Sequence, residues 1–363
     1  MDSLSPDHLR IIGAAQQKLL AGPERILLNI ISECPLRCSF CYTLSYLIKK
    51  QEPRQKAMSM ALIRRIAEAA TRWNVREITL IGRGEPTSHP HFRDIVSEFS
   101  SRNIAIDLLT NATFSRQDAP SISKIARTTV NFCSPDRESF IKIQAPRNPA
   151  MYDLVLRNIK FLVSLEKKYK KPCMEIIFIL THETIPLMEP MLKWAEKAGI
   201  QRLRFQFFDA IEETKFLSPD QKDLELLGHL CLVNSEKDWP FKHNLKEIAH
   251  RLKFPDSGRP PHCYEGWFSL YVDSDNSVRF CCLNKYTFLG NLNDSTLEEI
   301  WESPQAQKTR LRWLNPFPQN SEEDFCARCP YCKQNLLHDK NARDILNLSA
   351  KNAKSYKTNE AGL

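Results

Sequence analysis

The sequence predicts an α/β fold with a parallel sheet, followed by a small cysteine-rich domain. Between residues 25 and about 208, short β-rich runs alternate with longer amphipathic runs, which is the pattern of repeated βα units. Six of the 12 cysteines then lie between residues 263 and 335, where apolar residues are too few for a large core. A composition of 42% hydrophobic and 26% charged residues is that of a folded chain rather than a disordered one.

The chain begins with signals for a short helix. Ser5 is a favourable N-cap, Pro6 suits the first turn and Asp7 compensates the helix dipole, and we expect Gly22 to end this helix. Apolar residues at spacings of three and four predict further helices at residues 59–73 and 152–169. The expected strands are residues 25–32, 76–81, 104–110, 128–133, 174–180 and 202–207.

These elements fit either a parallel barrel or a doubly wound sheet, and in both the chemistry lies at the carboxyl ends of the strands. After residue 208, a polar helical region begins at Ser218, and a loop rich in Gly and Pro covers residues 255–261. The expected divisions are an N-terminal helical extension (1–24), the α/β domain (25–215), a helical linker (216–262), the cysteine-rich domain (263–335) and a polar tail (336–363).

The net charge and the lengths of the apolar stretches indicate which partners to expect. The net charge of +8 is a small excess of 51 basic over 43 acidic residues, which permits an anionic ligand without calling for nucleic acid. The longest apolar stretches, such as residues 174–180, fall far short of the ~18 residues of a membrane helix, so no membrane partner is expected. The start does not resemble a signal peptide, so we expect a cytoplasmic, reducing location.

In such a compartment the cysteines are expected to be ligands rather than disulfides. Nine of the 12 fall into tight groups, whereas Cys133, Cys173 and Cys231 are isolated and are expected in the core. The first group reads Cys34-Pro-Leu-Arg-Cys38-Ser-Phe-Cys41, directly after the first strand. A structural zinc ion takes four ligands, whereas a four-iron cubane bound by three cysteines keeps one iron open for another ligand.

The spacing of Cys34, Cys38 and Cys41, with the aromatic Phe40 before the last cysteine, resembles the signature of the radical S-adenosylmethionine (SAM) superfamily. The resemblance implies a partial (β/α)6 TIM-like barrel whose [4Fe-4S] cluster binds SAM at its open iron. It implies that one electron, from a donor such as flavodoxin or ferredoxin, cleaves SAM to a 5'-deoxyadenosyl radical. That radical abstracts hydrogen from the substrate.

A second segment, Gly82-Arg83-Gly84-Glu85-Pro86, follows the second strand. Glycines let a backbone approach a ligand closely, and a carboxylate accepts hydrogen bonds from an ammonium group. The segment resembles the family's GxGEP motif, in which the glycines and Glu85 hold the amino group of the methionine moiety. His89 and His91 follow and are expected to pack or cap a helix rather than bind a ligand.

Three further positions extend the resemblance. Asn111 ends the third strand where family members have Thr-Asn-Gly, although Ala112 replaces the glycine. Ser134 matches a position that contacts the ribose, and Arg147 matches one that meets the methionine carboxylate. For the last two, a turn residue and a solvated charge are equally good interpretations.

The second cysteine group is Cys263, the pair Cys281 and Cys282, and the series Cys326, Cys329 and Cys332. From ligand types alone, zinc and a [4Fe-4S] cluster are equally suitable. The layout, with Gly290-Asn291-Leu292 as a turn and a helix through Leu297, Ile300 and Trp301, resembles the twitch domain, a shortened SPASM domain. The resemblance implies one auxiliary [4Fe-4S] cluster held by Cys263, Cys281, Cys326 and Cys329. Cys282 and Cys332 are left over, and neighbours on an extended chain point to opposite sides.

Three functional hypotheses remain. Twitch-bearing relatives suggest oxidation or epimerisation of a small hydroxyl-bearing substrate, such as a sugar or aminocyclitol, with the auxiliary cluster as electron acceptor or substrate anchor. SPASM-type relatives suggest modification of a ribosomally made peptide. A non-enzymatic zinc protein that binds nucleic acid or a partner would explain the later cysteines but not the paired Cys34 and Glu85 segments. No motif identifies an acid, base or hydrogen donor.

Overall fold

The computed structural model describes residues 5–41, 57–170, 174–208, 210, 212–254, 263–282 and 288–314. The chain forms two compact units, each built from separate segments. Unit 1 consists of Met1–Leu27, Ala61–Ile78 and Gly258–Leu363, and unit 2 of Leu28–Met60 and Thr79–Ser257. Strands β1 (Arg25–Asn29) and β2 (Glu77–Ile81) each begin in unit 1 and end in unit 2.

Unit 2 is built on a parallel sheet with the strand order β1-β2-β3-β4-β5-β6-β7. Its further strands are β3 (Ala105–Thr110), β4 (Arg127–Asn131), β5 (Met174–Leu180), β6 (Arg202–Phe207) and β7 (Lys242–His243). Each strand from β3 to β7 pairs in parallel with the next. The six strands predicted from the sequence are confirmed to within a few residues, and β7 is an addition.

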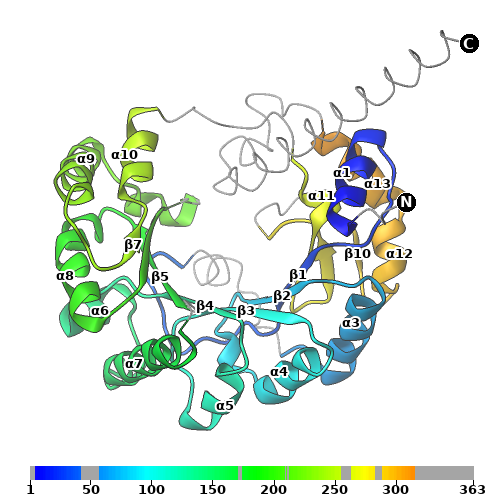
Figure 1. The fold of residues 1–363 in the computed structure, drawn as a ribbon, viewed down its shortest axis with the longest axis horizontal. Coiled ribbons are helices and arrows are strands. Elements are labelled where there is room, and N and C mark those ends of the chain that lie inside the picture. Colours follow the sequence, from blue (N-terminus) through cyan, green and yellow to red (C-terminus); the bar gives the residue numbers. More distant parts are fainter. Residues whose placement is uncertain are drawn as a thin grey trace, which may run out of the picture. The chain divides into compact units, whose positions relative to one another are not determined.

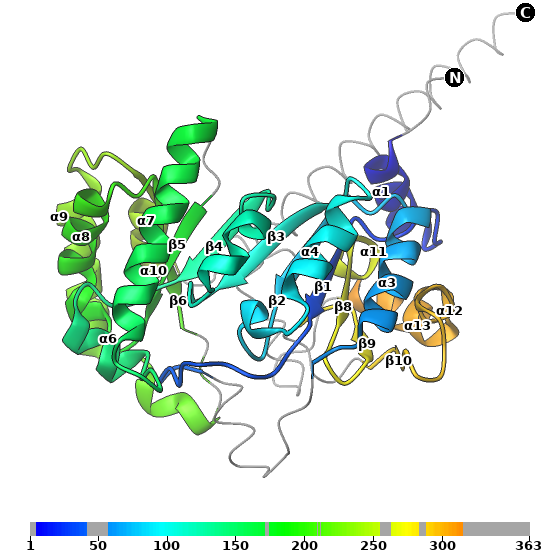
Figure 2. The same cartoon turned by 90° about the horizontal axis from the view of Figure 1, so that it is seen from below.

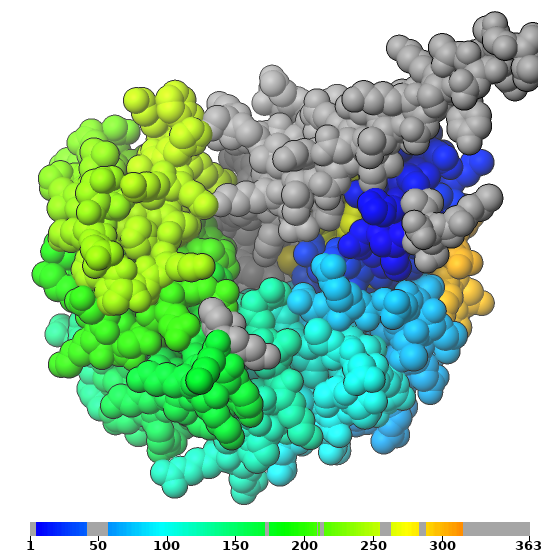
Figure 3. All heavy atoms as spheres, viewed as in Figure 1, coloured from blue at the N-terminus to red at the C-terminus, as the bar shows by residue number. Residues whose placement is uncertain are grey.

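Helices follow the strands of unit 2 along the chain: α4 (Phe92–Ser100), α5 (Ala119–Ile122), α6 (Arg137–Ile143), α7 (Met151–Tyr169), α8 (Met188–Ala198), α9 (Gln221–Ser235) and α10 (Leu245–Lys253). Figures 1 and 2 show α4, α7 and α8 on the outer side of the sheet. Helices α9 and α10 pack side by side and form one stretch of the surface in Figure 3. The region expected as a linker thus contributes two helices to unit 2, and residues 255–262 lie outside the described residues.

The core of unit 2 explains why β5 reads as an unbroken apolar run. Ile176, Phe178 and Leu180 are fully buried, and the ring of Phe178 meets that of Phe205 on β6 edge-on at 5.6 Å. A strand of a parallel sheet covered by helices is buried on both faces and needs no polar alternation. The parallel arrangement brings the carboxyl ends of the unit 2 strands to one edge of the sheet.

Unit 1 combines helices with the strand order β10-β9-β8, in which β9 pairs antiparallel with both β10 and β8. Its elements are α1 (Pro6–Gln16), most of α3 (Met60–Arg72), α11 (Glu265–Phe268), β8 (Ser269–Val272), β9 (Ser277–Arg279), β10 (Gly290–Asn291), α12 (Leu297–Glu302) and α13 (Pro304–Trp313). Arg310 is fully buried and donates to the carbonyl groups of Gly266 and Trp301 at 2.7 and 2.8 Å. Its guanidinium also lies 4.1 Å from the ring centroid of Trp301. The side chain of Arg310 thus joins α11 and α12 in the core of unit 1.

Two expectations for unit 1 are wrong. Gly22 does not end the first helix, because α1 already stops at Gln17, which adopts a left-handed conformation with φ 57°. Gly22 instead packs on Trp73, where a Cβ atom would come within 2.4 Å of the ring. Of the expected turn Gly290-Asn291-Leu292, the first two residues form strand β10 against β9 and only Leu292 lies in a turn, whereas the predicted helix through Leu297 is confirmed as α12. Within the described ranges, no helix is both long and apolar enough to cross a membrane.

Candidate functional site

The three cysteines that follow β1 lie together in residues 32–41, named here the cysteine loop. Cys34, Cys38 and Cys41 are partly buried free thiols. Burial raises the pKa of Cys38 well above its usual range, and the neighbouring sulfurs of Cys41 and Cys34 raise it further. Burial and the nearby Glu85 carboxylate raise the pKa of Cys34 to about 12. The structure therefore brings together the sulfurs that the sequence predicts to hold one metal centre.

Backbone hydrogen bonds fix the cysteine loop against residues 143–147, which end α6 and follow it. The bonds run from the N–H of Arg37 to the carbonyl of Gln144 (3.2 Å), from Ser39 to Ile143 (2.8 Å) and from Arg147 to Pro35 (3.1 Å). The Ser39 hydroxyl also donates to Glu183 beyond β5 at 2.9 Å. Arg147, the expected partner of the methionine carboxylate, is thus held beside the loop with its side chain exposed.

Gln144 joins the loop to the end of β4 and is a residue that the sequence analysis missed. Its side-chain Oε1 accepts from the N–H of Cys133 at 3.1 Å and from the hydroxyl of Ser134 at 3.5 Å. Ser134, expected near the ribose, is fully buried and directed at this amide. Cys133 is also fully buried, and its sulfur accepts from the N–H of Ile179 at 3.2 Å, as suits a core cysteine. A single glutamine at the end of a short amphipathic helix gives no sequence signal for this role.

The Gly82–Pro86 segment is bonded to the start of the cysteine loop. The N–H of Gly84 donates to the carbonyl of Ile31 at 3.0 Å, and the N–H of Glu85 donates to that of Glu33 at 2.8 Å. A Cβ atom on Gly84 would lie 2.2 Å from the Glu33 carbonyl oxygen and 2.6 Å from its nitrogen. Close approach to the chain's own backbone therefore requires a glycine here, and the expected contact of Gly84 with the methionine amino group stays a prediction.

Replacing Gly84 by alanine should separate the Gly82–Pro86 segment from the cysteine loop. The obstructing atoms are backbone and cannot rotate away, so we expect a loss of about 1–3 kcal/mol in the free energy of unfolding, together with lower iron content after reconstitution. Chemical denaturation and iron analysis measure the two effects. Gly228→Ala on α9 is the matched control, because no heavy atom lies within 4 Å of a Cβ there. Equal behaviour of the two variants would contradict the backbone explanation.

Glu85 is only 2% exposed, yet its carboxylate is well supplied with donors. Oε1 accepts from the hydroxyls of Thr110 (2.6 Å) and Thr87 (2.8 Å) and from the N–H of Thr87 (3.3 Å), and Oε2 accepts from the N–H of Asn111 (2.8 Å). Burial raises the pKa of Glu85, and these hydrogen bonds oppose that rise by stabilising the carboxylate. Since a carboxylate oxygen accepts about two hydrogen bonds, Oε2 keeps capacity for one further donor.

Asn111 connects this carboxylate to the cysteine loop. Its side-chain Nδ2 donates to the Sγ of Cys34 at 3.4 Å, while its backbone N–H binds Glu85. The following Ala112 has φ 61°, which is a left-handed conformation. The chain thus adopts this conformation with alanine at the position where family members have glycine. Phe40 is 8% exposed, and Pro86 begins a short 3-10 helix at Pro86–Ser88. Within unit 2, Asn111 thus contacts both Cys34 and Glu85.

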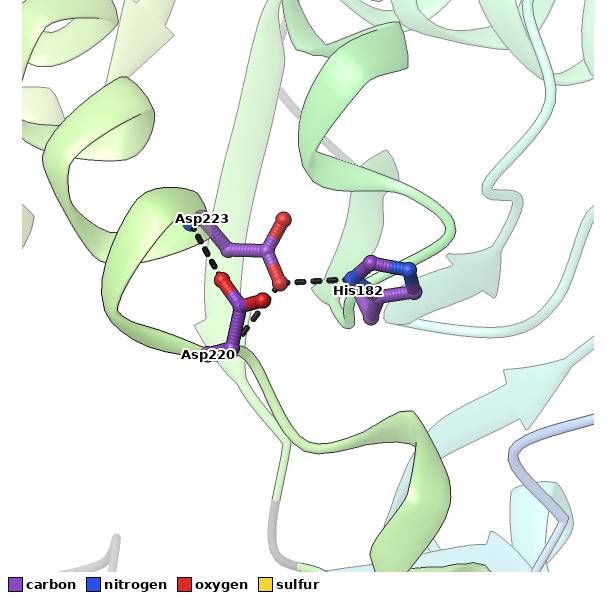
Figure 4. A group of neighbouring side chains, drawn as sticks. All are labelled: His182, Asp220 and Asp223. Atoms are coloured by element: carbon purple, nitrogen blue, oxygen red, sulfur yellow. Dashed lines mark hydrogen bonds and ion pairs between the residues drawn. The ribbon is translucent and has the colours of Figure 1, made fainter.

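The histidines near the site have structural partners. His89 is 3% exposed, and its ring accepts from the N–H of His91 and contacts the carbonyl of Met58 at 3.0 Å each. This agrees with the expected packing role. His182, Asp220 and Asp223 lie within 4.8 Å of one another beyond β5, as Figure 4 shows.

Asp220 and Asp223 form the capping box of α9, and Nδ1 of His182 binds Asp223 Oδ2 at 2.7 Å, which raises the pKa of His182. The group ties the loop after β5 to the start of α9.

The second cysteine group is described in part. Cys263, Cys281 and Cys282 belong to unit 1, whereas Cys326, Cys329 and Cys332 lie outside the described residues. The thiols of Cys281 and Cys282 hydrogen-bond to each other, and this bond raises the pKa of Cys282. The two thiols therefore lie close together, and which of them faces the cluster stays a prediction.

Comparison with known families accounts for both cysteine groups. Residues 28–195 match the model of the radical SAM superfamily, and residues 263–330 match that of SPASM, an iron-sulfur cluster-binding domain. The chain therefore contains a radical SAM domain followed by a C-terminal SPASM domain. Its cofactors are accordingly SAM and [4Fe-4S] clusters, and the alternative of a non-enzymatic zinc protein is not supported.

Two curated proteins and one solved structure place the radical SAM enzyme among its relatives. It is 22% identical to a tungsten-containing aldehyde ferredoxin oxidoreductase cofactor-modifying protein from Pyrococcus furiosus, over 84% of this chain and 86% of that protein. It is 21% identical to a PqqA peptide cyclase from Gluconobacter oxydans, over 78% of this chain and 77% of the other. The structure of Streptococcus suis SuiB with its precursor peptide SuiA shares the fold, with a TM-score of 0.63 at 14% identity, over 88% and 74% of the two chains.

The site fits the cofactors of the family. The cysteine loop supplies three neighbouring sulfurs and no fourth protein ligand from within its own residues, as a cubane with one open iron requires. Beside them, Oε2 of the buried Glu85 carboxylate accepts one hydrogen bond and has the capacity to accept another, as from an ammonium donor. These residues therefore could hold the cluster and the amino group of SAM on one edge of the unit 2 sheet.

Proposed function

We propose that this radical SAM enzyme modifies a ribosomally synthesised peptide. In this proposal Cys34, Cys38 and Cys41 hold the cluster, and Glu85 binds the ammonium of SAM. A cluster held there would supply the electron for reductive cleavage of SAM, and the 5'-deoxyadenosyl radical so formed would take a hydrogen atom from the peptide. What supports the cofactor-binding part is the direct contact of Asn111 with both Glu85 and Cys34 within unit 2.

The choice of a peptide rests on the relatives. The similarity to a PqqA peptide cyclase extends over 78% of this chain and 77% of that protein. SuiB, which shares the fold, was crystallised with a precursor peptide. These relatives favour the peptide hypothesis over the small hydroxyl-bearing substrate that the twitch resemblance suggested first. No described side chain distinguishes oxidation from epimerisation.

The proposal includes an auxiliary [4Fe-4S] cluster in the SPASM domain. Cys263 and Cys281, together with Cys326 and Cys329, remain the proposed ligands. Because Cys282 lies in hydrogen-bonding contact with Cys281, either sulfur of the pair can face the cluster. The auxiliary cluster would accept the electron left on the substrate radical, so that loss of a proton to solvent completes a two-electron oxidation. A flavodoxin or ferredoxin is the proposed electron donor to the first cluster.

The test is turnover with defined candidates. Anaerobically reconstituted enzyme is given SAM, a strong reductant and each synthetic peptide encoded by short reading frames beside its gene. We expect one peptide to change mass and, when it is deuterated, to transfer deuterium into 5'-deoxyadenosine, both measured by mass spectrometry. A parallel series of sugars and aminocyclitols should remain unchanged. Turnover of a member of that series, with every peptide unmodified, would replace the peptide proposal by the first hypothesis.

A further inference from the structure

The side chain of Asn111 has a defined orientation that directs a donor at a cysteine sulfur. Its Oδ1 accepts two hydrogen bonds from Thr113, one from the backbone N–H at 3.0 Å and one from the hydroxyl at 2.5 Å. Exchanging the amide oxygen and nitrogen would set the NH2 donor group against the backbone N–H of Thr113, so the assignment of the two atoms follows from the network. The Nδ2 group must then face Cys34, whose Sγ lies 3.4 Å away.

The backbone around Asn111 is fixed as well. Its own N–H binds Glu85, and the N–H of Ala112 binds the Thr110 hydroxyl at 3.0 Å. The side chain of Asn158 on α7 donates to the carbonyl groups of Ala112 and Phe114 at 2.8 and 2.7 Å. Asn111 itself is only 9% exposed. Because the backbone and side chain of Asn111 are held by these bonds in a buried site, its Nδ2 group keeps its direction toward Cys34 when the charge on the sulfur changes.

An N–H donor to a cysteine sulfur acts on the redox properties of the cluster that the sulfur holds. Reduction adds negative charge, part of which lies on the sulfurs, so a hydrogen bond to sulfur stabilises the reduced form more than the oxidised form. The consequence is a less negative reduction potential. In a radical SAM enzyme this makes the cluster easier to reduce before SAM is cleaved.

We propose that Asn111 is a positioning residue that raises the reduction potential of the radical-site cluster through its hydrogen bond to Cys34. The inference rests on the proposed role of Cys34 as an iron ligand. It differs from the role that the resemblance implies for Asn111, which is contact with SAM. The two roles separate experimentally, because the potential of the cluster is measured without SAM present.

The experiment compares Asn111→Ala with the unaltered enzyme, both reconstituted, by EPR at a series of fixed potentials. The spectrum of the Cys34→Ala, Cys38→Ala, Cys41→Ala variant is subtracted to remove signals of the auxiliary cluster. Loss of one hydrogen bond to a charged group should lower the ratio of reduced to oxidised cluster about tenfold at a given potential, which corresponds to about 59 mV for one electron. Asn111→Asp, which keeps the shape but replaces the donor by an anion, should lower the ratio further.

Two controls make the result specific. Ser39→Ala alters a side chain next to Cys38 that binds Glu183 rather than a sulfur, and it should leave the potential unchanged. Thr113→Val removes one of the bonds that orient Asn111 and should give an intermediate shift. Iron content is measured in every variant, so that loss of the cluster is distinguished from a shifted potential. An Asn111→Ala potential equal to that of Ser39→Ala, at full iron content, would overturn the proposal while leaving the cluster assignment intact.

Discussion

Replacing Cys34, Cys38 and Cys41 together by alanine should abolish the formation of 5'-deoxyadenosine and remove about four irons per chain, the content of one cubane. The cysteine loop is anchored by backbone N–H groups of Arg37 and Ser39. These bonds do not involve the sulfurs, so the loop should keep its conformation when the thiols are removed. Iron and sulfide analysis of the reconstituted protein, with chromatographic detection of 5'-deoxyadenosine, measures both effects.

The control for this variant is Cys231→Ala. Cys231 is fully buried on α9, and burial raises the pKa of its thiol to about 12, so it is an inert core cysteine. The substitution is chemically the same and should change neither iron content nor SAM cleavage. A triple variant with the full iron content of the unaltered enzyme would show that the first cluster is held elsewhere.

The strands of unit 2 were predictable because each is an apolar or β-branched run bounded by polar turns. Residues 174–180 and 202–207 match β5 and β6 without adjustment. Strand β7 was not predictable, because two residues, Lys242 and His243, carry no periodicity. Strand β8 in unit 1 is four residues long and buried at every position, so it also lacks the alternation that marks a strand.

The error at Gly22 has a different cause. Glycine is the usual residue after a helix end, but Gln17 takes the left-handed conformation here and Gly22 is needed for contact with Trp73. The sequence shows that a position needs a small residue without showing what lies against it. The same ambiguity affected Gly84, whose neighbour is the backbone of Glu33, 51 residues earlier in the chain.

For the site, the sequence pointed to the three cysteines and Glu85, but it did not show the contacts that hold them in place. The cysteines and Glu85 stand in motifs with fixed local spacing. The bond from Asn111 to Cys34 joins residues 77 positions apart, and the bonds of Gln144 to the loop and to Cys133 depend on how α6 ends. Such contacts follow from strand order and register, which residue patterns along one chain do not specify.

Glu85→Gln should weaken SAM binding by about one to two orders of magnitude while leaving every cluster in place. The substitution removes the negative charge that would pair with the ammonium of SAM, a charge-assisted hydrogen bond of about 1.5–3 kcal/mol. The carbonyl oxygen of glutamine can still accept the three hydrogen bonds from Thr87 and Thr110 that Oε1 accepts now. Only the bond from the Asn111 N–H must be lost, because an NH2 group replaces Oε2. Alanine would leave all of these buried donors unpaired and is the less informative change.

Equilibrium binding of SAM to the anaerobic enzyme measures the effect, and iron content shows whether the clusters persist. Thr87→Val is the matched control, because it removes one hydroxyl donor to Glu85 but leaves the carboxylate charged. We expect its affinity for SAM to remain within about threefold of the unaltered enzyme, since one neutral hydrogen bond contributes about 1 kcal/mol or less here. If Glu85→Gln binds SAM as tightly as Thr87→Val does, then Glu85 serves only to join β2, β3 and the cysteine loop. The ammonium would then need another partner on the same edge of the sheet.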